Sequence, residues 1–172
     1  SDIYKAIMQL TQFTDYGLRS LMYLAAQPDR LCSVREIAEH YAISRNHLVK
    51  VVHRLSQLGY VTSSKGKGGG IRLACKSEEL RLGDLVLALE PNMHLVECFN
   101  RETNTCTVVS ACKLKHFLAD ASKVFIGSLN QHTLADAVTD NKLFQKRTPS
   151  AASGNGSHWK VFPSRFGGDL NK

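Results

Sequence analysis

The sequence predicts a mainly α-helical protein with one small β-hairpin, and three observations support this fold class. Apolar residues recur at three- and four-residue steps through much of the first 58 residues. Two short β-prone runs then flank a glycine-rich tip, which is typical of a hairpin. A long amphipathic segment begins at about residue 113. The 172 residues suffice for one ordinary globular domain, or for a small domain with an appendage.

Two helices are expected first. Thr14 is the predicted N-cap of a helix that runs to about Gln27, because apolar residues then follow at the spacing of one buried face. The stretch Ser33-Val-Arg-Glu36 predicts a capping box, in which each end residue satisfies a free backbone N–H of the other. This box opens a short helix that reaches about Tyr41.

A third helix and the hairpin complete a DNA-binding arrangement. Ser44 is the predicted N-cap of a helix over 45–58, and Gly59 suits the left-handed position that ends such a helix. The hairpin spans 60–74, and its tip, 65–70, holds four glycines and two lysines. This order is that of a winged helix-turn-helix, whose third helix enters the major groove and whose hairpin, the wing, reaches the neighbouring backbone or minor groove.

Charge is concentrated in the same region. The chain carries a net charge of +7, and residues 44–76 contain seven Lys or Arg residues with no acid. Residues 142–172 form a second basic block. A local excess of this kind is expected for binding phosphate backbones, although a solvated basic face would give the same count. Its place on an amphipathic helix and a glycine-rich wing favours DNA binding.

Individual DNA contacts can be assigned from side-chain chemistry. Arg45 is the expected base reader, since its guanidinium can pair with guanine O6 and N7, and Asn46 could read adenine. The lysines are expected to contact phosphate and so to position the protein without specifying sequence. The predicted DNA-binding residues are Ser44, Arg45, Asn46, His47 and Lys50 on the third helix, with Lys65 and Lys67 on the wing.

The second half of the chain is predicted to be helical around one loop. A short helix over 84–90 ends at Pro91, and residues 92–111 show no period and are expected to form a loop. The long helix from Lys113 repeats an apolar face, part of which should pack on a second subunit, or else on its own domain. That face comprises Leu114, Phe117, Leu118, Ala121, Val124, Phe125 and Ser128. A last short helix is expected over 133–138.

These elements divide the chain. A DNA-binding domain is expected over 8–80, and the loop with the dimerisation helix over 81–141. Residues 1–7 and 142–172 are expected to be poorly ordered, because 148–157 has the composition of a linker.

Three of the five cysteines suggest a metal centre. Cys98, Cys106 and Cys112 are separated by seven and five residues, so the chain between them can fold around one centre. Soft thiolates select zinc or an iron–sulfur cluster, and the absence of a tight Cys-x₂-Cys pair favours the cluster. A fourth ligand must then come from elsewhere. The alternative is that these are unrelated free cysteines, as we expect Cys32 and Cys75 to be.

Several classes of protein are disfavoured. No run reaches the roughly 18 to 20 apolar residues of a membrane helix, and residues 1–30 lack the layout of a secretory signal. A cytoplasmic location is therefore expected. An odd cysteine count excludes a complete intramolecular disulfide framework. A metalloenzyme is disfavoured because no acid, base or pocket constellation accompanies the cysteines, and a DNA-architectural protein would leave them unexplained.

Several motifs together resemble one family. They are Met8-Gln-Leu-Thr-Gln-Phe-Thr-Asp-Tyr-Gly-Leu-Arg19, Ile43-Ser-Arg-Asn-His-Leu-Val-Lys50, Leu58-Gly-Tyr-Val-Thr62, Gly66-Lys-Gly-Gly-Gly-Ile-Arg-Leu73, Arg81-Leu-Gly-Asp84 and Thr133-Leu-Ala-Asp136. With the three-cysteine loop, they resemble the iron–sulfur winged-helix transcriptional regulators, and among these the nitric-oxide-sensing repressors. The resemblance covers residues 8 to about 141. It implies a homodimer that binds operator DNA and releases it when nitric oxide damages the cluster.

The resemblance also implies roles for particular residues. Cys98, Cys106 and Cys112 match the cluster ligands, and Asp15 matches an aspartate that completes a [4Fe-4S] cluster from the partner subunit, so this cluster is favoured over [2Fe-2S]. Members that regulate iron–sulfur assembly use a histidine three positions after the last cysteine, where this chain has Lys115. His116 is therefore the second candidate for the fourth ligand. A regulator of iron–sulfur assembly and an iron-free thiol sensor remain the alternatives.

Overall fold

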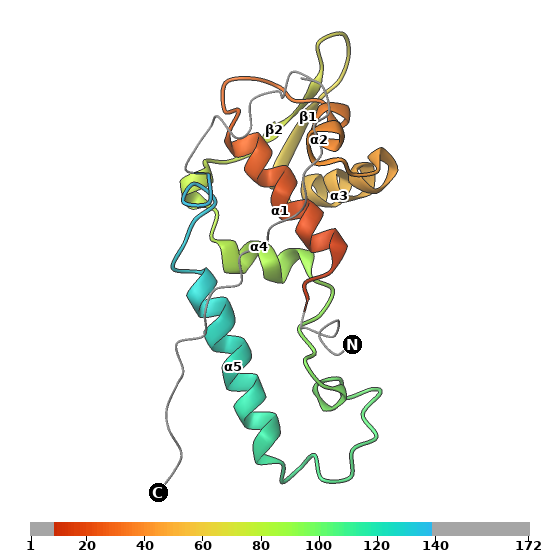
Figure 1. Ribbon diagram of the computed structural model, residues 1–172, viewed down its shortest axis with the longest axis vertical. Helices are drawn as coiled ribbons and strands as arrows, with labels where there is room; N and C mark the ends of the chain where they lie inside the picture. Colours follow the sequence, from red (N-terminus) through yellow and green to blue (C-terminus); the bar gives the residue numbers. More distant parts are fainter. Residues whose placement is uncertain (1–8, 139–172) are drawn as a thin grey trace, which may run out of the picture.

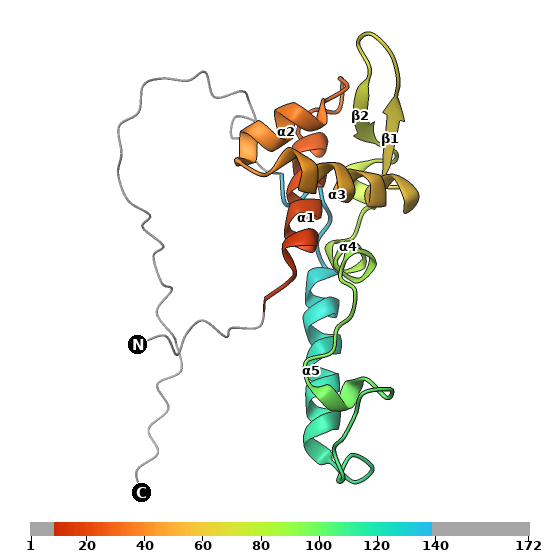
Figure 2. The same ribbon diagram turned by 90° about the vertical axis from the view of Figure 1, so that its right-hand side faces the viewer.

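The computed structural model describes residues 9–138, and it confirms the predicted fold class (Figure 1). Three helices and a hairpin form a unit at one end of the molecule, which we call the head (Figure 1). Below it, α4 lies across the head, and α5 and a long loop extend away from it (Figures 1 and 2). The elements are α1 (Gln12–Ala25), α2 (Val34–Tyr41), α3 (Arg45–Gln57), β1 (Val61–Ser64), β2 (Gly70–Leu73), α4 (Leu82–Leu89) and α5 (Lys113–Leu129), with 3₁₀ turns at Ser77–Glu79 and Glu97–Phe99.

The first helix begins earlier than the sequence suggested. Its N-cap is Thr11, not Thr14, and the Thr11 side chain accepts a hydrogen bond from the backbone N–H of Thr14. The prediction chose the wrong one of two threonines three residues apart. Thr14 is fully buried within the helix, and its hydroxyl donates to the carboxylate of Glu90. A long-range acceptor, which local spacing does not reveal, therefore holds this threonine inside the helix.

The ends of α2 and α3 agree closely with the predictions. The capping box between Ser33 and Glu36 is present in both directions. Ser44 occupies the N-cap position of α3, although its side chain makes no capping hydrogen bond. Gly59 has a φ of +79°, the left-handed conformation expected just after the helix.

One apolar core holds the head together. It is built from α1, α2, α3, the hairpin and α4, and its fully buried members include Leu21, Leu24, Ile37, Leu48, Leu55 and Leu85. The hairpin is antiparallel, with Ser64 opposite Gly70. Cys32 adds a short third edge: its N–H donates to Ile71 O at 2.9 Å, and its carbonyl accepts from Ile71 N at 2.8 Å. The wing is thereby fixed to the segment that leads into α2.

The C-terminal end of α5 is joined to the N-terminal end of α4. The side-chain amide of Asn130 makes two hydrogen bonds of 3.0 Å with Asp84: its Oδ1 accepts from the Asp84 backbone N–H, and its Nδ2 donates to the Asp84 carboxylate. At Gly83 the helices approach so closely that a Cβ atom would lie 2.6 Å from the carbonyl oxygen of Ile126. Because both contacts lie at one end of each helix, α5 leaves the head in a defined direction.

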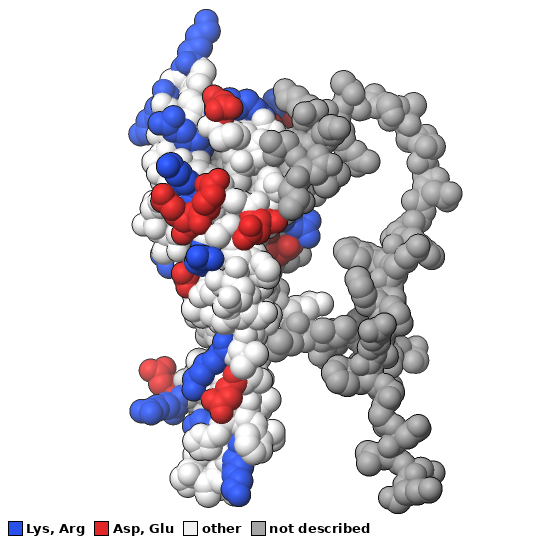
Figure 3. All heavy atoms as spheres, turned by 90° about the vertical axis from the view of Figure 1, so that its left-hand side faces the viewer, with Lys and Arg blue, Asp and Glu red and all other residues white. Residues whose placement is uncertain are grey.

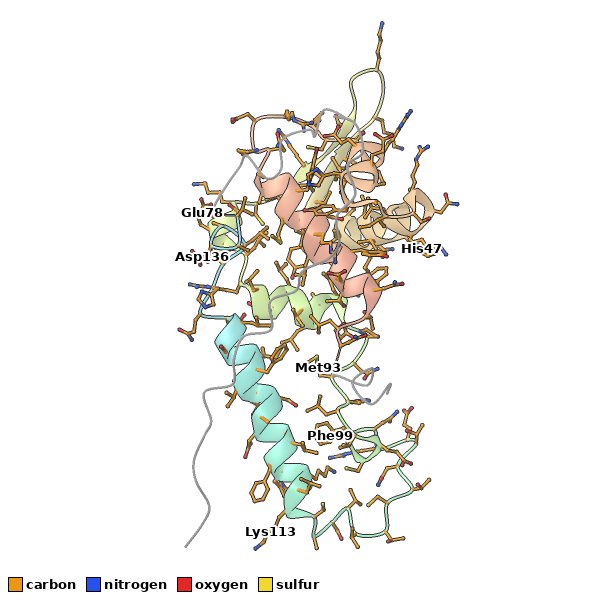
Figure 4. All side chains as sticks on the ribbon, viewed as in Figure 1. His47, Glu78, Met93, Phe99, Lys113 and Asp136 are labelled. Carbon is orange, nitrogen blue, oxygen red and sulfur yellow. The ribbon has the colours of Figure 1, made fainter. Side chains whose placement is uncertain are left out.

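The short helix predicted over 133–138 is wrong: these residues form turns. Thr133 makes a β-bridge with Arg81, which draws its backbone out of a helical path. The Asp136 carboxylate then accepts from the Thr133 backbone N–H at 2.7 Å and from its hydroxyl at 3.0 Å. Ala135 N donates to Ser77 O, so the labelled Glu78 and Asp136 lie near each other (Figure 4).

Within residues 9–138, no helix is both long enough and apolar enough to cross a lipid bilayer. The terminal segments that the sequence predicted to be poorly ordered, 1–7 and 142–172, lie outside the described residues.

Candidate nucleic-acid interface and candidate metal centre

The outer face of α3 carries the predicted DNA contacts. Its inner face is buried through Leu48, Val51, Val52 and Leu55. Ser44, Arg45, Asn46, His47 and Lys50 are all exposed, as predicted for side chains that meet DNA. Two further exposed residues, Val49 and His53, share this outer face, and the sequence analysis missed both. Their positions follow from the helical repeat once the buried face is known.

His47 and Lys50 differ from Arg45 and Asn46 in their surroundings. Both border a shallow depression whose other lining residues include Gln12, Phe13 and Tyr16 of α1 (Figure 4 labels His47). Arg45 and Asn46 do not border this depression. His47 and Lys50 therefore lie on the side of α3 nearest α1, whereas Arg45 and Asn46 lie away from it.

The wing presents a basic, exposed tip. Residues 62–69 are all exposed, including Lys65 and Lys67. Gly66 and Gly68 have φ values of +98° and +83°, so the tight tip depends on residues without a side chain. Basic side chains occupy the tip of the hairpin and the surface just below it (Figure 3). Arg72 on β2 is also exposed, opposite Thr62, and is a basic residue that the predicted contacts omitted.

A polar cluster fixes the approach to α2. The Glu36 carboxylate accepts from Arg30 Nη1 at 2.6 Å, from Ser33 N at 3.2 Å and from the Tyr23 hydroxyl at 3.3 Å. Burial alone would raise the pKa of Glu36, but the hydrogen bonds from Arg30, Ser33 and Tyr23, with the Arg30 charge, outweigh it. The pKa of Glu36 is therefore held below its ordinary value. This cluster joins α1, α2 and the segment that pairs with the wing.

The three predicted cluster ligands lie on one segment, the cysteine loop (residues 91–112). Cys98 is in the 3₁₀ turn, Cys106 is in an irregular stretch, and Cys112 is the N-cap of α5. All three thiols are free and half-buried. Figure 4 shows Phe99 on the limb of the loop opposite α5, and Lys113 at the far end of that helix. In this single chain, residues 9–138 contain no group of three or more His, Cys, Asp or Glu side chains placed to hold a metal ion.

The remaining two cysteines have a different environment. Cys32 is fully buried in the core of the head, and burial raises the pKa of its thiol to about 11. Cys75 is half-buried, and burial, with the nearby charge of Glu79, raises the pKa of its thiol as well. Because the thiolate is the form that binds metal, both residues are poor ligands.

Asp15 is separate from the cysteines in this chain. It lies in the first turn of α1, where its carboxylate accepts from Arg19 Nε at 2.9 Å and lies 2.8 Å from Arg19 Nη2. The Arg19 guanidinium also stands 5.9 Å from the centre of the Tyr41 ring. His116, the other candidate for the fourth ligand, is exposed in the first turn of α5.

The start of α1 is tied to the start of the cysteine loop. Glu90, which directly precedes the loop, accepts from Thr11 N at 3.2 and 3.3 Å and from the Thr11 hydroxyl at 3.1 Å. These partners are 79 residues apart in the chain, and the sequence analysis did not pair them. The helix that carries Asp15 and the loop that carries the cysteines therefore share an anchor.

The apolar residues predicted on α5 divide into two sets. Leu118 and Phe125 line a pocket with Met93, Leu95 and other residues of the loop, so they pack toward their own chain. Leu114, Phe117 and Val124 are 61%, 65% and 71% exposed, and no residue of α5 is fully buried. The second set forms an open apolar face, which we call the α5 outer face.

Comparison with known proteins identifies one family and several relatives. The family described as Rrf2, iron-dependent transcriptional regulator, matches residues 10–140. A protein of Shouchella clausii named HTH-type transcriptional regulator NsrR is 52% identical over 132 residues, covering 76% of this chain and 89% of that protein. One of the same name from Bacillus subtilis is 44% identical over 140 residues, covering 81% and 96%.

Two solved structures show the same fold. CymR, the global cysteine regulator of B. subtilis, matches with a TM-score of 0.59 and 25% identity, covering 77% of this chain and 98% of its own. IscR of T. potens matches with a TM-score of 0.60 and 24% identity, covering 83% and 94%.

Proposed function

The chain belongs to the Rrf2 family of iron-dependent transcriptional regulators, and from this premise we propose that it is a nitric-oxide-sensitive repressor. As a member of this family it is a transcriptional regulator and not an enzyme. In the proposed function a homodimer binds operator DNA and holds an iron–sulfur cluster, [4Fe-4S], in each subunit. The observation that carries this proposal is the 52% identity over 132 residues to a regulator named NsrR. The family match over residues 10–140 includes both the head and the cysteine loop.

The head supports operator binding. Arg45 and Asn46 are exposed on α3 and have the side-chain chemistry to hydrogen-bond to base edges. Lys50, Lys65 and Lys67 are also exposed, and as cations they can neutralise phosphates. The buried inner face of α3 fixes the direction in which these side chains project.

The chemistry of the thiols supports the cluster. Cys98, Cys106 and Cys112 are free, half-buried and on one irregular segment, whereas Cys32 and Cys75 have raised pKa values inside or beside the core. Three soft thiolates and one oxygen ligand fit an iron–sulfur cluster with one weakly held iron. When bound, the cluster supplies iron that nitric oxide attacks directly.

Asp15 is the proposed fourth ligand, supplied from the partner subunit. In the single chain its carboxylate is held by Arg19, so iron and Arg19 would compete for the same oxygen atoms. Without the partner's cluster, the Asp15 carboxylate would be held by Arg19, as it is in the single chain. Because α1 begins at the contact to Glu90 and packs on α3, such an exchange would act on the helix that supports α3. The exchange therefore links the state of the cluster to the placement of the head.

The α5 outer face supports the homodimer. Leu114, Phe117 and Val124 lie three and seven residues apart, and so form one continuous stripe along the helix. An open apolar stripe of this kind is buried when two copies pair about a two-fold axis. Pairing would also bring a second subunit near each cysteine loop, which the proposed ligand exchange requires.

The cluster ligands are tested by replacing single cysteines. We expect anaerobically purified protein to be brown, with absorbance at about 400 nm. Cys106→Ala should lose its iron and its operator affinity, because two thiolates do not retain the cluster. Cys75→Ala is the matched control, being half-buried and free but outside the loop. Full iron content in Cys106→Ala would contradict the ligand assignment, and a colourless parent protein that still binds its operator would favour an iron-free thiol sensor.

The role of Asp15 is tested with an isosteric change. Asp15→Asn keeps the size of the side chain and its place in the first turn, but the amide is a poorer iron ligand. We expect this variant to retain cysteine-bound iron, to bind the operator more weakly and to react differently with nitric oxide. Electrophoretic mobility shifts and absorbance during nitric oxide titration measure these properties. If Asp15→Asn behaves like the parent while His116→Ala does not, the fourth ligand is His116.

A further inference from the structure

Val49 is an exposed apolar residue in the middle of the candidate DNA interface. It is 48% exposed on α3, one helical turn after Arg45 and one turn before His53. The other large apolar residues with comparable exposure among residues 9–138 lie elsewhere: Leu87 on α4, Val108 in the cysteine loop, and Leu114, Phe117 and Val124 on α5. In the described part of α1, α2 and α3, therefore, Val49 is the one large apolar side chain with so high an exposed fraction.

Neither its environment nor its helix propensity explains a valine here. A β-branched residue is a weaker helix former than the lysine, arginine or glutamine that usually occupy an open helical position. The side chains beside it on the outer face are Arg45, Asn46, Lys50 and His53, all polar or charged and all exposed. A protein partner would have to desolvate this basic surface to reach one valine, whereas DNA would neutralise it.

We infer that Val49 is a specificity-determining residue that contacts the 5-methyl group of a thymine in the operator. This inference rests on the proposed operator binding and adds to it a particular base contact. In the major groove, the thymine methyl is the apolar group that a base pair presents. Against any other base edge, the valine would remove water from polar atoms without replacing the lost hydrogen bonds. Val49 therefore favours an A·T pair.

The spacing along α3 places this thymine beside the bases read by Arg45 and Asn46. One helical turn advances about 5.4 Å, and successive base pairs are about 3.4 Å apart. The thymine methyl should thus lie within about two base pairs of the guanine or adenine that these residues contact. Together the three side chains would read a short block in each half-site, by hydrogen bonds at one end and by a methyl contact at the other.

The experiment removes the apolar group from each side of the contact in turn. Full-length protein holding its cluster selects duplexes from a random-sequence pool, and each thymine of the selected duplex is then replaced in turn by uracil. Uracil pairs as thymine does and lacks the methyl group. We expect one position in each half-site where this change weakens binding about 4-fold, the value for one buried methyl group, and about 15-fold when both half-sites are changed.

The matching protein variant is Val49→Ala. It should bind the thymine duplex more weakly and show no further loss with uracil at that position, because the contact is already missing. Alanine is a better helix former than valine, so α3 is retained. Leu87→Ala removes an equally exposed apolar side chain from α4 and should keep the full uracil effect.

Three other results would contradict the proposed thymine contact. If uracil weakens the binding of Val49→Ala as much as that of the parent, the loss of affinity comes from the shape of the DNA, and the contact is refuted. A selected duplex with no methyl-dependent position refutes the inference and leaves operator binding intact. If the protein selects no duplex at all, the proposed function fails, and the inference fails with it.

Discussion

The head and the α5 region of this protein differ in how completely each is buried by its own chain. In the head, α1, α2 and α3 each place residues in one apolar core, and the polar cluster around Glu36 joins the helices to the wing. The α5 helix is the longest in the structure, with 17 residues, and has none that is fully buried. The three cysteines of the preceding loop, Cys98, Cys106 and Cys112, are likewise only half-buried.

This difference separates a self-sufficient unit from an incomplete one. The core of the head supplies the burial that a small domain needs, so its geometry follows from its own sequence. The cysteine loop and the α5 outer face have apolar and thiol groups that the single chain leaves partly open. A cluster and a second copy of the chain are the two components that would complete them, and both belong to the proposed function.

The largest expected effect compares one substitution in the two regions. Leu55→Ala empties a fully buried position in α3 and should lower the free energy of unfolding by about 2 to 5 kcal/mol. Leu114→Ala makes the same change at a position that is 61% exposed on α5. At low protein concentration its free energy of unfolding should therefore differ little from that of the parent. Denaturant melts measure the first effect.

The same pair of variants also sharpens the assignment of the α5 outer face. Sedimentation at increasing protein concentration should show weaker self-association for Leu114→Ala than for the parent. Equal losses of unfolding free energy at the two positions, with unchanged self-association, would show that α5 is packed like the head.

A smaller effect distinguishes two kinds of contact within the head. If the dimer neutralises roughly 6 to 8 phosphates, log K for the operator should fall with log salt with a slope of about −5 to −7. Lys67→Ala should weaken binding to all sequences alike and reduce the slope by about 2 per dimer. Arg45→Ala should in addition relax the base preference. Fluorescence anisotropy across a salt series measures both, and a slope near zero in the parent would contradict the docking arrangement.

The smallest expected effect concerns pH. The pKa of Glu36 is lowered in the folded protein from its ordinary value of 4.5, so its contribution to stability is present above that pH. The contribution is lost as the pH falls below 4.5 through the folded pKa. Glu36→Gln should therefore reduce the melting temperature near neutral pH, and the difference from the parent should shrink in acid.

A control for this pH effect lies on the same helix. Glu39 pairs with Arg35, but both side chains are largely exposed, so Glu39→Gln should have little effect at any pH. Melting curves that shift equally for the two variants would show that the cluster around Glu36 adds nothing beyond a surface ion pair.

Local sequence patterns determined most of the head. The capping box at Ser33, the glycine at 59 and the hairpin with its lysine-bearing tip follow from short-range geometry, which the neighbouring residues themselves impose. The exposed face of α3 could also be predicted, because a helix repeats every 3.6 residues and its apolar positions identify the buried side.

Contacts between distant parts of the chain decided the rest. The Thr14 hydroxyl lies inside α1 because Glu90 accepts its hydrogen bond, and residues 133–138 form turns because Thr133 pairs with Arg81. Periodicity alone could not separate Leu118 and Phe125, which face the cysteine loop, from Leu114 and Phe117, which face outward. Spacing predicted the three cysteines as a set, but their distance from Asp15 depends on where α1 lies. Such positions depend on partners distant in the sequence, and tertiary packing alone brings those partners together.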